Sequence, residues 1–390
     1  MTQQDHSNVV TGYVGSHGFT QLLFWSAFYY LLPALSAQIA LETHWPVLHI
    51  STTYTLAFLL WAMCAPIVGY WIDAGHGSKI MRSGLVAGII LLIAISQTSD
   101  KLVFSVLVIL LGACMAATLY DPCFAMMMRR LKRAGPNAVA TVTLIAGFAT
   151  LLTFPLVLVL SEHMTWQHTV LVFAGLAALG LIFLPSEPDT QPIAPRESKA
   201  IVLGKGPALI AVSFGLVMMG HAILLFLLPV ALSQTGSETN AAFLAMAILG
   251  PAQIAGRIIW RYYGDAFTPQ NCALAMFVCL CLPATLLLLF GISPSFLYIA
   301  LVIQGACYGV HTILRPSLAQ NYLHSALLGR GLGTIAMIGL LMMAVGPAVG
   351  GLAWSMAGVK GLMTIVLGLN FAALLLGLLL RKCVPTEVSP

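Results

Sequence analysis

The feature that most constrains the fold is a succession of about twelve long apolar segments separated by short polar breaks. Each segment is close to the roughly 20 residues that a helix needs to cross a bilayer. Only 7% of the residues are charged, against roughly 25% in soluble domains. The segments are continuous rather than alternating, which disfavours a barrel of strands. We therefore expect an all-α polytopic membrane protein. Its spans are expected at about 17–41, 51–72, 81–98, 102–128, 137–160, 166–184, 206–232, 240–260, 272–291, 295–322, 331–355 and 361–380.

The loop charges predict the orientation of these spans. The first 19 residues contain no Lys or Arg and no signal-peptide pattern, so the first span is expected to be retained. Of the 17 Lys and Arg residues, we assign 14 to one side and only Lys101 and Lys360 to the other. The side rich in positive charge is cytoplasmic. With twelve spans, both termini are expected on that side. The net charge of +5 reflects this bias rather than binding of nucleic acid.

The chain divides into two similar halves. The longest loop, 185–205, is rich in proline and charge and is expected to be a cytoplasmic linker between halves 1–184 and 206–390. FYYLLPALSAQ in the first span resembles LLFLLPVALSQ in the seventh. The fourth and tenth spans share GAC, followed by Asp121-Pro122 and Arg315-Pro316. Such internal repetition is typical of transporters whose site lies where the repeats meet.

The loop after the second span, GYWIDAGHGSK, resembles the G-x-x-x-D-R-x-G-R-R/K motif of the major facilitator superfamily. It departs from the motif at Ala74 and Ser78. GPAVGG in the eleventh span resembles the Gly-Pro motif that drug antiporters carry in their fifth span. YDPCFA and TLIAGFATLLTFPL resemble a group of bacterial permeases that is loosely similar to monocarboxylate carriers. The resemblance implies a monomer in the bacterial inner membrane, with twelve helices in two pseudo-symmetric six-helix bundles and transport by alternating access.

The same resemblance implies a cytoplasmic latch made by Gly69, Asp73, Gly77 and Lys79. In this interpretation the Asp73 carboxylate caps the N-terminus of the eleventh span near Gly331 and Gly333, because the amides there carry partial positive charge. The alternative is that Asp73 only ends a helix.

Two charged residues, Asp121 and Arg315, lie well inside apolar spans. Ionisable groups in a bilayer are costly and indicate function by default. Arg315 is therefore a candidate to bind an anionic substrate, or to release Asp121 for protonation when substrate arrives. The alternatives are a permanent structural pair, and a place for Asp121 in the cytoplasmic latch near Arg129.

Two spans carry a polar face, and a third contributes a histidine. Gln304, Tyr308, His311 and Arg315 are spaced four, three and four residues apart, which places them on one side of a helix. Gln21, Trp25 and Tyr29 form a second face, with Tyr30 beside it, and His221 lies near the middle of the seventh span. These residues are the candidate substrate-binding set. Hydrogen bonding between helices is the alternative for each of them.

Asp121, His221 and His311 are candidate proton carriers, since histidine titrates near neutral pH. A sodium site is disfavoured, because Asp121 is the only carboxylate embedded in a span. The eight cysteines are scattered, and we expect neither a metal site nor a cofactor.

The sequence thus predicts a secondary active transporter for a small, anionic organic solute, coupled to protons. An efflux pump for a drug-like or siderophore-like molecule is the alternative. A transporter-like receptor without flux also stays open. An enzyme is not expected, because the chain contains no HExxH, GxSxG or Walker loop.

Overall fold

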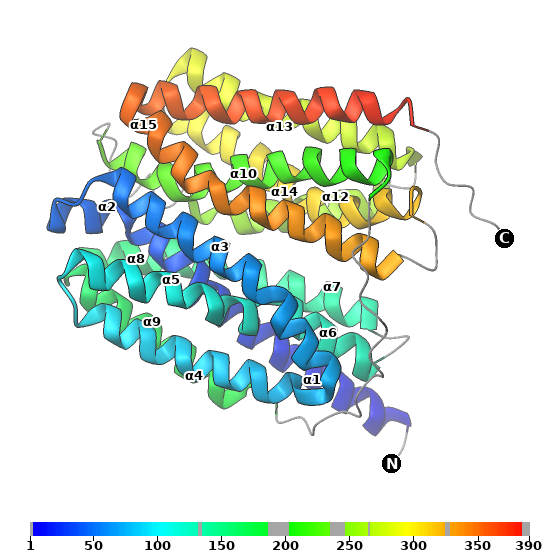
Figure 1. The fold of residues 1–390 in the computed structure, drawn as a ribbon, viewed down its shortest axis with the longest axis horizontal. Helices are drawn as coiled ribbons and strands as arrows, with labels where there is room; N and C mark the ends of the chain where they lie inside the picture. The colour runs from blue at the N-terminus through cyan, green and yellow to red at the C-terminus, as the bar shows by residue number, and fades with distance from the viewer. Residues whose placement is uncertain are drawn as a thin grey trace. The chain divides into compact units, whose positions relative to one another are not determined.

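A computed structural model describes residues 3–131, 135–185, 203–234, 246–263, 266–323 and 328–383. Within these ranges every regular element is a helix (Figure 1). The first half contains α1 Gln3–Phe24, η1 Trp25–Tyr30, α2 Leu31–Thr43, α3 Val47–Trp71, η2 Ile72–His76, α4 Gly77–Ser96, α5 Lys101–Thr118, α6 Tyr120–Leu131, α7 Gly135–Ala146, α8 Ala149–Ser161 and α9 Trp166–Phe183. The second half contains α10 Lys205–Gln234, α12 Leu249–Tyr263, α13 Pro269–Phe290, α14 Pro294–Gln320 and α15 Leu328–Leu380.

The helices form two compact units. Unit 1 comprises residues 1–45 and 59–196, and unit 2 comprises 46–58 and 197–390. The first half of α3 therefore belongs to unit 2 and its second half to unit 1. Most of the expected linker, 185–205, lies outside the described residues, as do residues 240–245 of the expected eighth span.

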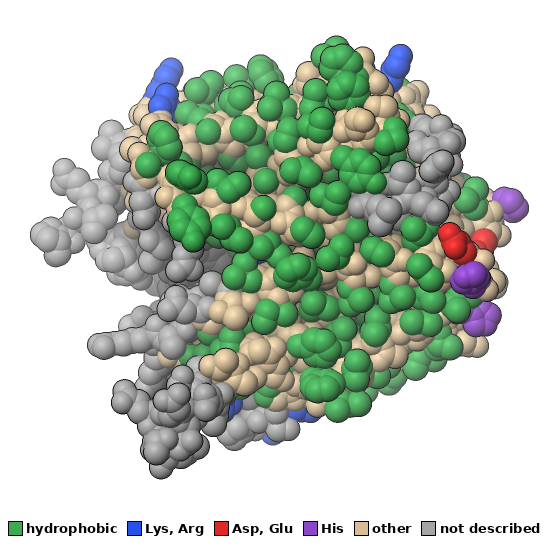
Figure 2. Space-filling model, turned by 180° about the vertical axis from the view of Figure 1, so that it is seen from behind, with side chains coloured by type: hydrophobic (Ala, Val, Ile, Leu, Met, Phe, Trp, Pro, Cys, Tyr) green, Lys and Arg blue, Asp and Glu red, His purple; other side chains and the backbone are tan. Residues whose placement is uncertain are grey.

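Ten segments of the described chain are long and apolar enough to cross a membrane. One of them, Thr334–Leu380, covers nearly all of two of the expected spans, 331–355 and 361–380. The chain turns between these two at Ala357 and Gly358, where the backbone leaves helical geometry and Gly358 has φ of 54°. Side chains such as Leu102 and Ile182 are 72% and 77% exposed, and Figure 2 shows hydrophobic side chains spread over the visible helices. This surface suits contact with lipid chains.

Prolines and polar side chains determine where the helices begin and break. The Asp100 carboxylate accepts from the backbone N–H groups of Leu102 and Val103 at 2.8 Å, so it caps the start of α5. The fourth span breaks at Leu119, where ψ of −155° separates α5 from α6. In an unbroken helix, the Thr118 carbonyl would pair with residue 122, but Pro122 has no N–H. The Gln21 amide donates to this carbonyl instead, at 2.8 Å.

Helices α12 and α14 pack at unusually short range in unit 2. A Cβ atom added to Gly309 would collide with the Gln253 carbonyl, and one added to Gly256 would collide with the Ala306 carbonyl. A Cβ on Gly305 would lie 2.7 Å from the Ala252 Cβ. Small residues four apart on both helices thus allow backbone contact, as in other membrane helix pairs. Arg257 follows Gly256 and therefore lies next to this contact in the chain.

The GPAVGG segment of α15 also makes close contacts within unit 2. A Cβ on Gly350 would lie 2.9 Å from Ile223 of α10, and one on Gly351 would collide with Ser51 of α3. Pro347 cannot donate a hydrogen bond, and the next amide, that of Ala348, donates to the Thr55 hydroxyl at 2.8 Å. The GPAVGG segment, which resembles an antiporter motif, therefore forms a packing surface for α10 and the first half of α3.

Candidate functional site

The polar face of α14 lies against α10 in unit 2, and the structure brings four of the predicted residues together there. His221 of α10 stacks on Tyr308 of α14, with ring centroids 3.5 Å apart and planes inclined by 11°. Tyr308 also stacks with His311 at 5.2 Å and 6°. The Gln304 amide lies 3.5 Å from the His221 Nδ1 atom. Three nearly parallel rings thus fix the position of the Tyr308 side chain.

Gln304 and His311 are each held by one polar atom. The His311 Nε2 atom lies 3.0 Å from the Phe214 carbonyl. A carbonyl can only accept, so Nε2 carries a proton and Nδ1 is an acceptor in the neutral ring. The Gln304 Nε2 atom likewise donates toward His221, which leaves Oε1 as the acceptor. Both acceptors, His311 Nδ1 and Gln304 Oε1, are buried and have no hydrogen-bond partner within the described part of the chain.

Arg315 lies at the end of this face and is half-buried. Its Nη1 atom contacts the Met218 Sδ atom at 3.5 Å. It would lie 3.4 Å from a Cβ atom on Gly339 of α15, so a glycine there leaves room for the guanidinium group. Met218 belongs to α10, so three helices of unit 2 surround this charge.

Arg257 is the site residue that sequence reasoning missed. Its position in the chain groups it with the arginines at the cytoplasmic ends of the spans. In the structure it belongs to α12 and follows Gly256, which packs directly against the backbone of α14. The signal that could have found it is the pair of small-residue motifs, Ala252 with Gly256 and Gly305 with Gly309, which predicts close packing of the two helices.

The predicted face of the first span lies in unit 1. Trp25 and Tyr29 belong to the π-helix η1, and such interruptions are frequent at functional sites. The Trp25 ring lies 4.6 Å from that of Tyr120 of α6, with the planes inclined by 46°, and it contacts Tyr29 at 4.9 Å and Tyr30 at 6.1 Å. Gln21 is fully buried, and its amide donates to the Thr118 carbonyl at the break between α5 and α6. Gln21 therefore supports the broken helix, while Trp25, Tyr30 and Tyr120 are partly exposed.

Asp121 lies in the first turn of α6, directly after the break in the fourth span, and its side chain is exposed. The amides at the start of a helix favour a negative charge, so the carboxylate suits this position. Asp121 belongs to unit 1 and Arg315 to unit 2. Their pairing stays a prediction.

The loop of the predicted latch turns at Gly75, which has φ of 94° and so favours glycine. A Cβ on Gly77 would lie 2.9 Å from Met126 of α6, so Gly77 permits close packing, whereas Gly69 has open space beside it. Lys79 is exposed. The side chain of Asp73 lies outside the described residues, and the latch stays a prediction.

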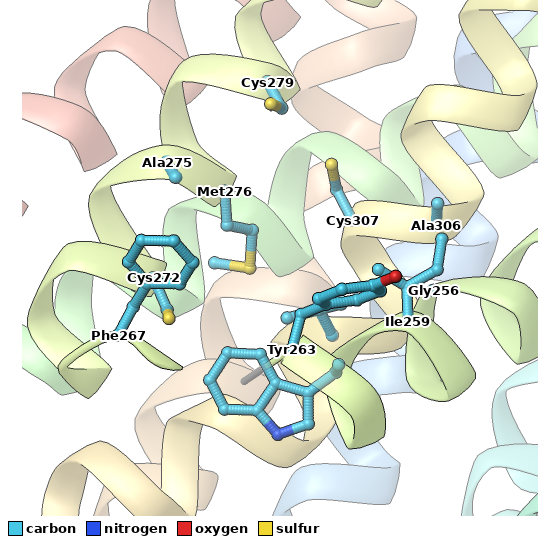
Figure 3. A pocket seen from close by; sticks show the side chains of 12 residues that line it. Gly256, Ile259, Tyr263, Phe267, Cys272, Ala275, Met276, Cys279, Ala306 and Cys307 are labelled. Atoms are coloured by element: carbon cyan, nitrogen blue, oxygen red, sulfur yellow. The ribbon is translucent and has the colours of Figure 1, made fainter. Parts of the chain in front are cut away.

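A separate cavity of about 400 Å³ lies in unit 2 and contains none of the predicted site residues. Figure 3 shows Tyr263 of α12, Met276 and Cys279 of α13 and Cys307 of α14 around it. Its lining is almost entirely apolar, and it uses a different face of α14 from the one that carries Tyr308 and Arg315. The cavity therefore suits a hydrocarbon chain rather than a charged solute.

Comparison with known proteins gives one consistent result. The family model of the Major Facilitator Superfamily matches residues 18–347. The fold resembles the crystal structure of a mutant of the nucleoside transporter NupG, with a TM-score of 0.77 at 14% identity over 96% of this chain and 99% of that one. It also resembles a bacterial homologue of the human lysosomal transporter Spinster, with a TM-score of 0.74 at 12% identity over 98% of both chains. A D-xylose-proton symporter gives a TM-score of 0.73 at 13% identity over 97% of this chain and 98% of that one.

These similarities confirm the predicted fold class and the resemblance to a known family that the sequence motifs indicated. They also support a multi-pass membrane transporter rather than an enzyme. The match covers far more than half of the chain, and the chain belongs to the Major Facilitator Superfamily.

Proposed function

We propose that this protein is a proton-coupled secondary transporter that moves a small, anionic organic solute by alternating access. The observation that carries the proposal is the half-buried Arg315, which lies on the same face of α14 as Tyr308 and beside Met218 and Gly339, with Arg257 on the neighbouring helix α12. We further propose that it operates in a bacterial inner membrane with both termini in the cytoplasm, as the loop charges predict.

An anion is favoured by the charge balance of this unit. The helices α10, α12, α13, α14 and α15 contain no Asp or Glu in their described residues. Arg257 and Arg315 therefore place two positive charges among apolar helices, where an intramembrane charge usually marks a substrate or ion path. Guanidinium groups bind carboxylates through paired, charge-assisted hydrogen bonds, and the Tyr308 hydroxyl adds a third donor.

Proton coupling would follow from the same electrostatics. A proton added to His221, which stacks on Tyr308, would add a third positive charge to this unit, and like charges repel strongly in a medium of low dielectric. A bound anion would offset this repulsion. By thermodynamic linkage, the anion and the proton would then each promote binding of the other. Asp121, exposed at the start of α6, is a further candidate carrier in unit 1.

A second candidate function is efflux of a drug-like molecule that contains a flat ring. The aromatic cluster of unit 1 favours it, because Trp25 and Tyr120 are partly exposed, and a flat molecule can stack on aromatic rings. This ligand would need no charge.

A ligand panel distinguishes the two candidates. Purified protein would be heated with short-chain carboxylates, with flat uncharged drug-like compounds, and with nucleosides and D-xylose, for which two of the structural neighbours are named. A ligand at about 100 times its Kd stabilises the folded state by about 2.7 kcal/mol. We expect carboxylates to raise the unfolding temperature and the uncharged compounds to leave it unchanged. Stabilisation by the uncharged compounds alone would contradict the anion proposal.

A further inference from the structure

Two buried acceptors flank Tyr308 on the polar face of α14. The Gln304 side chain is 1% exposed and that of His311 is 2% exposed. Within the described residues, no hydrogen-bond partner reaches Gln304 Oε1 or His311 Nδ1. A buried acceptor without a partner costs free energy, so native proteins rarely retain one without a reason.

The orientation of both acceptors is set by the protein. The Phe214 carbonyl holds the His311 Nε2 atom at 3.0 Å, so the ring cannot turn without losing that bond. The contact of the Gln304 amide with His221 similarly directs Oε1 away from the histidine. Tyr308 lies between these two residues on the helix and is held by stacking with both histidines. The polar face of α14 thus carries the donor Arg315 at one end and two acceptors on either side of Tyr308. Arg257 is a second donor, on the neighbouring helix α12.

From this arrangement we propose that the carried anion is a hydroxylated carboxylate. Its carboxylate binds the guanidinium groups of Arg257 and Arg315, and its hydroxyl groups donate to His311 Nδ1 and Gln304 Oε1. The inference rests on the proposed function and narrows its substrate class. A protonated amine would also donate, but it would place another positive charge near two arginines, so a neutral hydroxyl suits the site better.

The spacing along α14 indicates which hydroxyl uses which acceptor. His311 precedes Arg315 by one turn, which corresponds to a rise of about 6 Å. A short 2-hydroxy acid can span that distance when the long arginine side chain bends toward it. Gln304 lies about 16 Å before Arg315 along the helix axis, so only a longer, polyhydroxylated acid reaches it.

The test measures binding of matched pairs of acids to the purified full-length chain, by thermal shift and by calorimetry. Lactate is compared with propionate, and gluconate with hexanoate, so that each pair differs in its hydroxyl groups. We expect the hydroxylated acid of each pair to bind at least about tenfold more tightly, because a site built for a hydroxyl rejects the analogue that lacks it. Equal affinity within both pairs would overturn the inference while leaving the anion proposal intact. If no acid binds, the proposed function fails as well.

Two variants test which residues produce the preference for hydroxylated acids. Gln304→Met keeps the side-chain length but removes the acceptor, and it is expected to abolish the preference for gluconate over hexanoate. Arg257→Gln is expected to weaken all four acids alike, because it removes a charge that every carboxylate uses. A gluconate preference that survives in Gln304→Met would contradict the role of Gln304. Tighter binding of serine than of lactate would show that the donor is an amine and would overturn the choice of a hydroxyl.

Discussion

Replacing Arg315 with alanine is expected to reduce transport by about thirtyfold or more, because loss of a charged partner at a desolvated contact costs about 2–5 kcal/mol. Arg315 contacts Met218 in the space that Gly339 leaves, on the face of α14 that carries Tyr308. Radiolabelled uptake into proteoliposomes measures the loss. Arg315→Lys is expected to keep part of the activity, since it keeps the charge but not the paired donors.

The control for this variant is Lys360→Ala, which removes a positive charge from the turn after Gly358 in α15 without touching the site. It is expected to transport normally.

Asp121→Ala is expected to abolish transport too, if Asp121 exchanges between Arg315 and a proton. Where the two residues form only a structural pair, exchanging them in a double variant should partly restore activity. Full activity of Arg315→Ala would refute every role proposed for this residue.

The second large effect is expected from Gly309→Leu, which should prevent normal packing of α12 against α14. Any Cβ at this position collides with the Gln253 backbone carbonyl, which cannot move independently of its helix. Overpacking typically costs about 1–3 kcal/mol, and backbone contact places this substitution at the upper end of that range. We expect a lower unfolding temperature in detergent and loss of ligand binding, because separation of the two helices would move Arg257 away from Tyr308.

The matched control is Gly368→Leu in α15, where a Cβ would meet nothing within 4 Å. This variant adds the same side chain to a helix of the same unit and is expected to fold and to transport like the native protein. Equal stability of the two leucine variants would contradict the close packing of α12 and α14.

The polar stripe of α14 was predictable because helical spacing alone places Gln304, Tyr308, His311 and Arg315 on one face. The segments that cross the membrane were predictable for a similar reason, since their length and apolar composition carry the signal. Both inferences depend only on the local sequence. Neither requires knowledge of which helices are neighbours.

Arg257 could not be assigned by the same reasoning. Its position near the end of a span is typical of arginines that contact cytoplasmic water or lipid head groups. Only the approach of α12 to α14, made possible by Gly256 and Gly309, places it beside the helix that carries Tyr308. The break at Leu119 was also missed, although Pro122 removes the donor that the Thr118 carbonyl would use. The partner that repairs this loss, Gln21, lies 97 residues away in the sequence.

Uptake of a radiolabelled hydroxylated carboxylate into proteoliposomes, with and without an imposed pH gradient, tests the central claim most directly. With the exterior more acidic than the lumen, we expect the anion to accumulate above its external concentration, because proton binding and anion binding promote each other. Dissipating the gradient with a protonophore should return uptake to simple equilibration. Binding without any flux would identify a receptor. Flux that is indifferent to the pH gradient would contradict proton coupling.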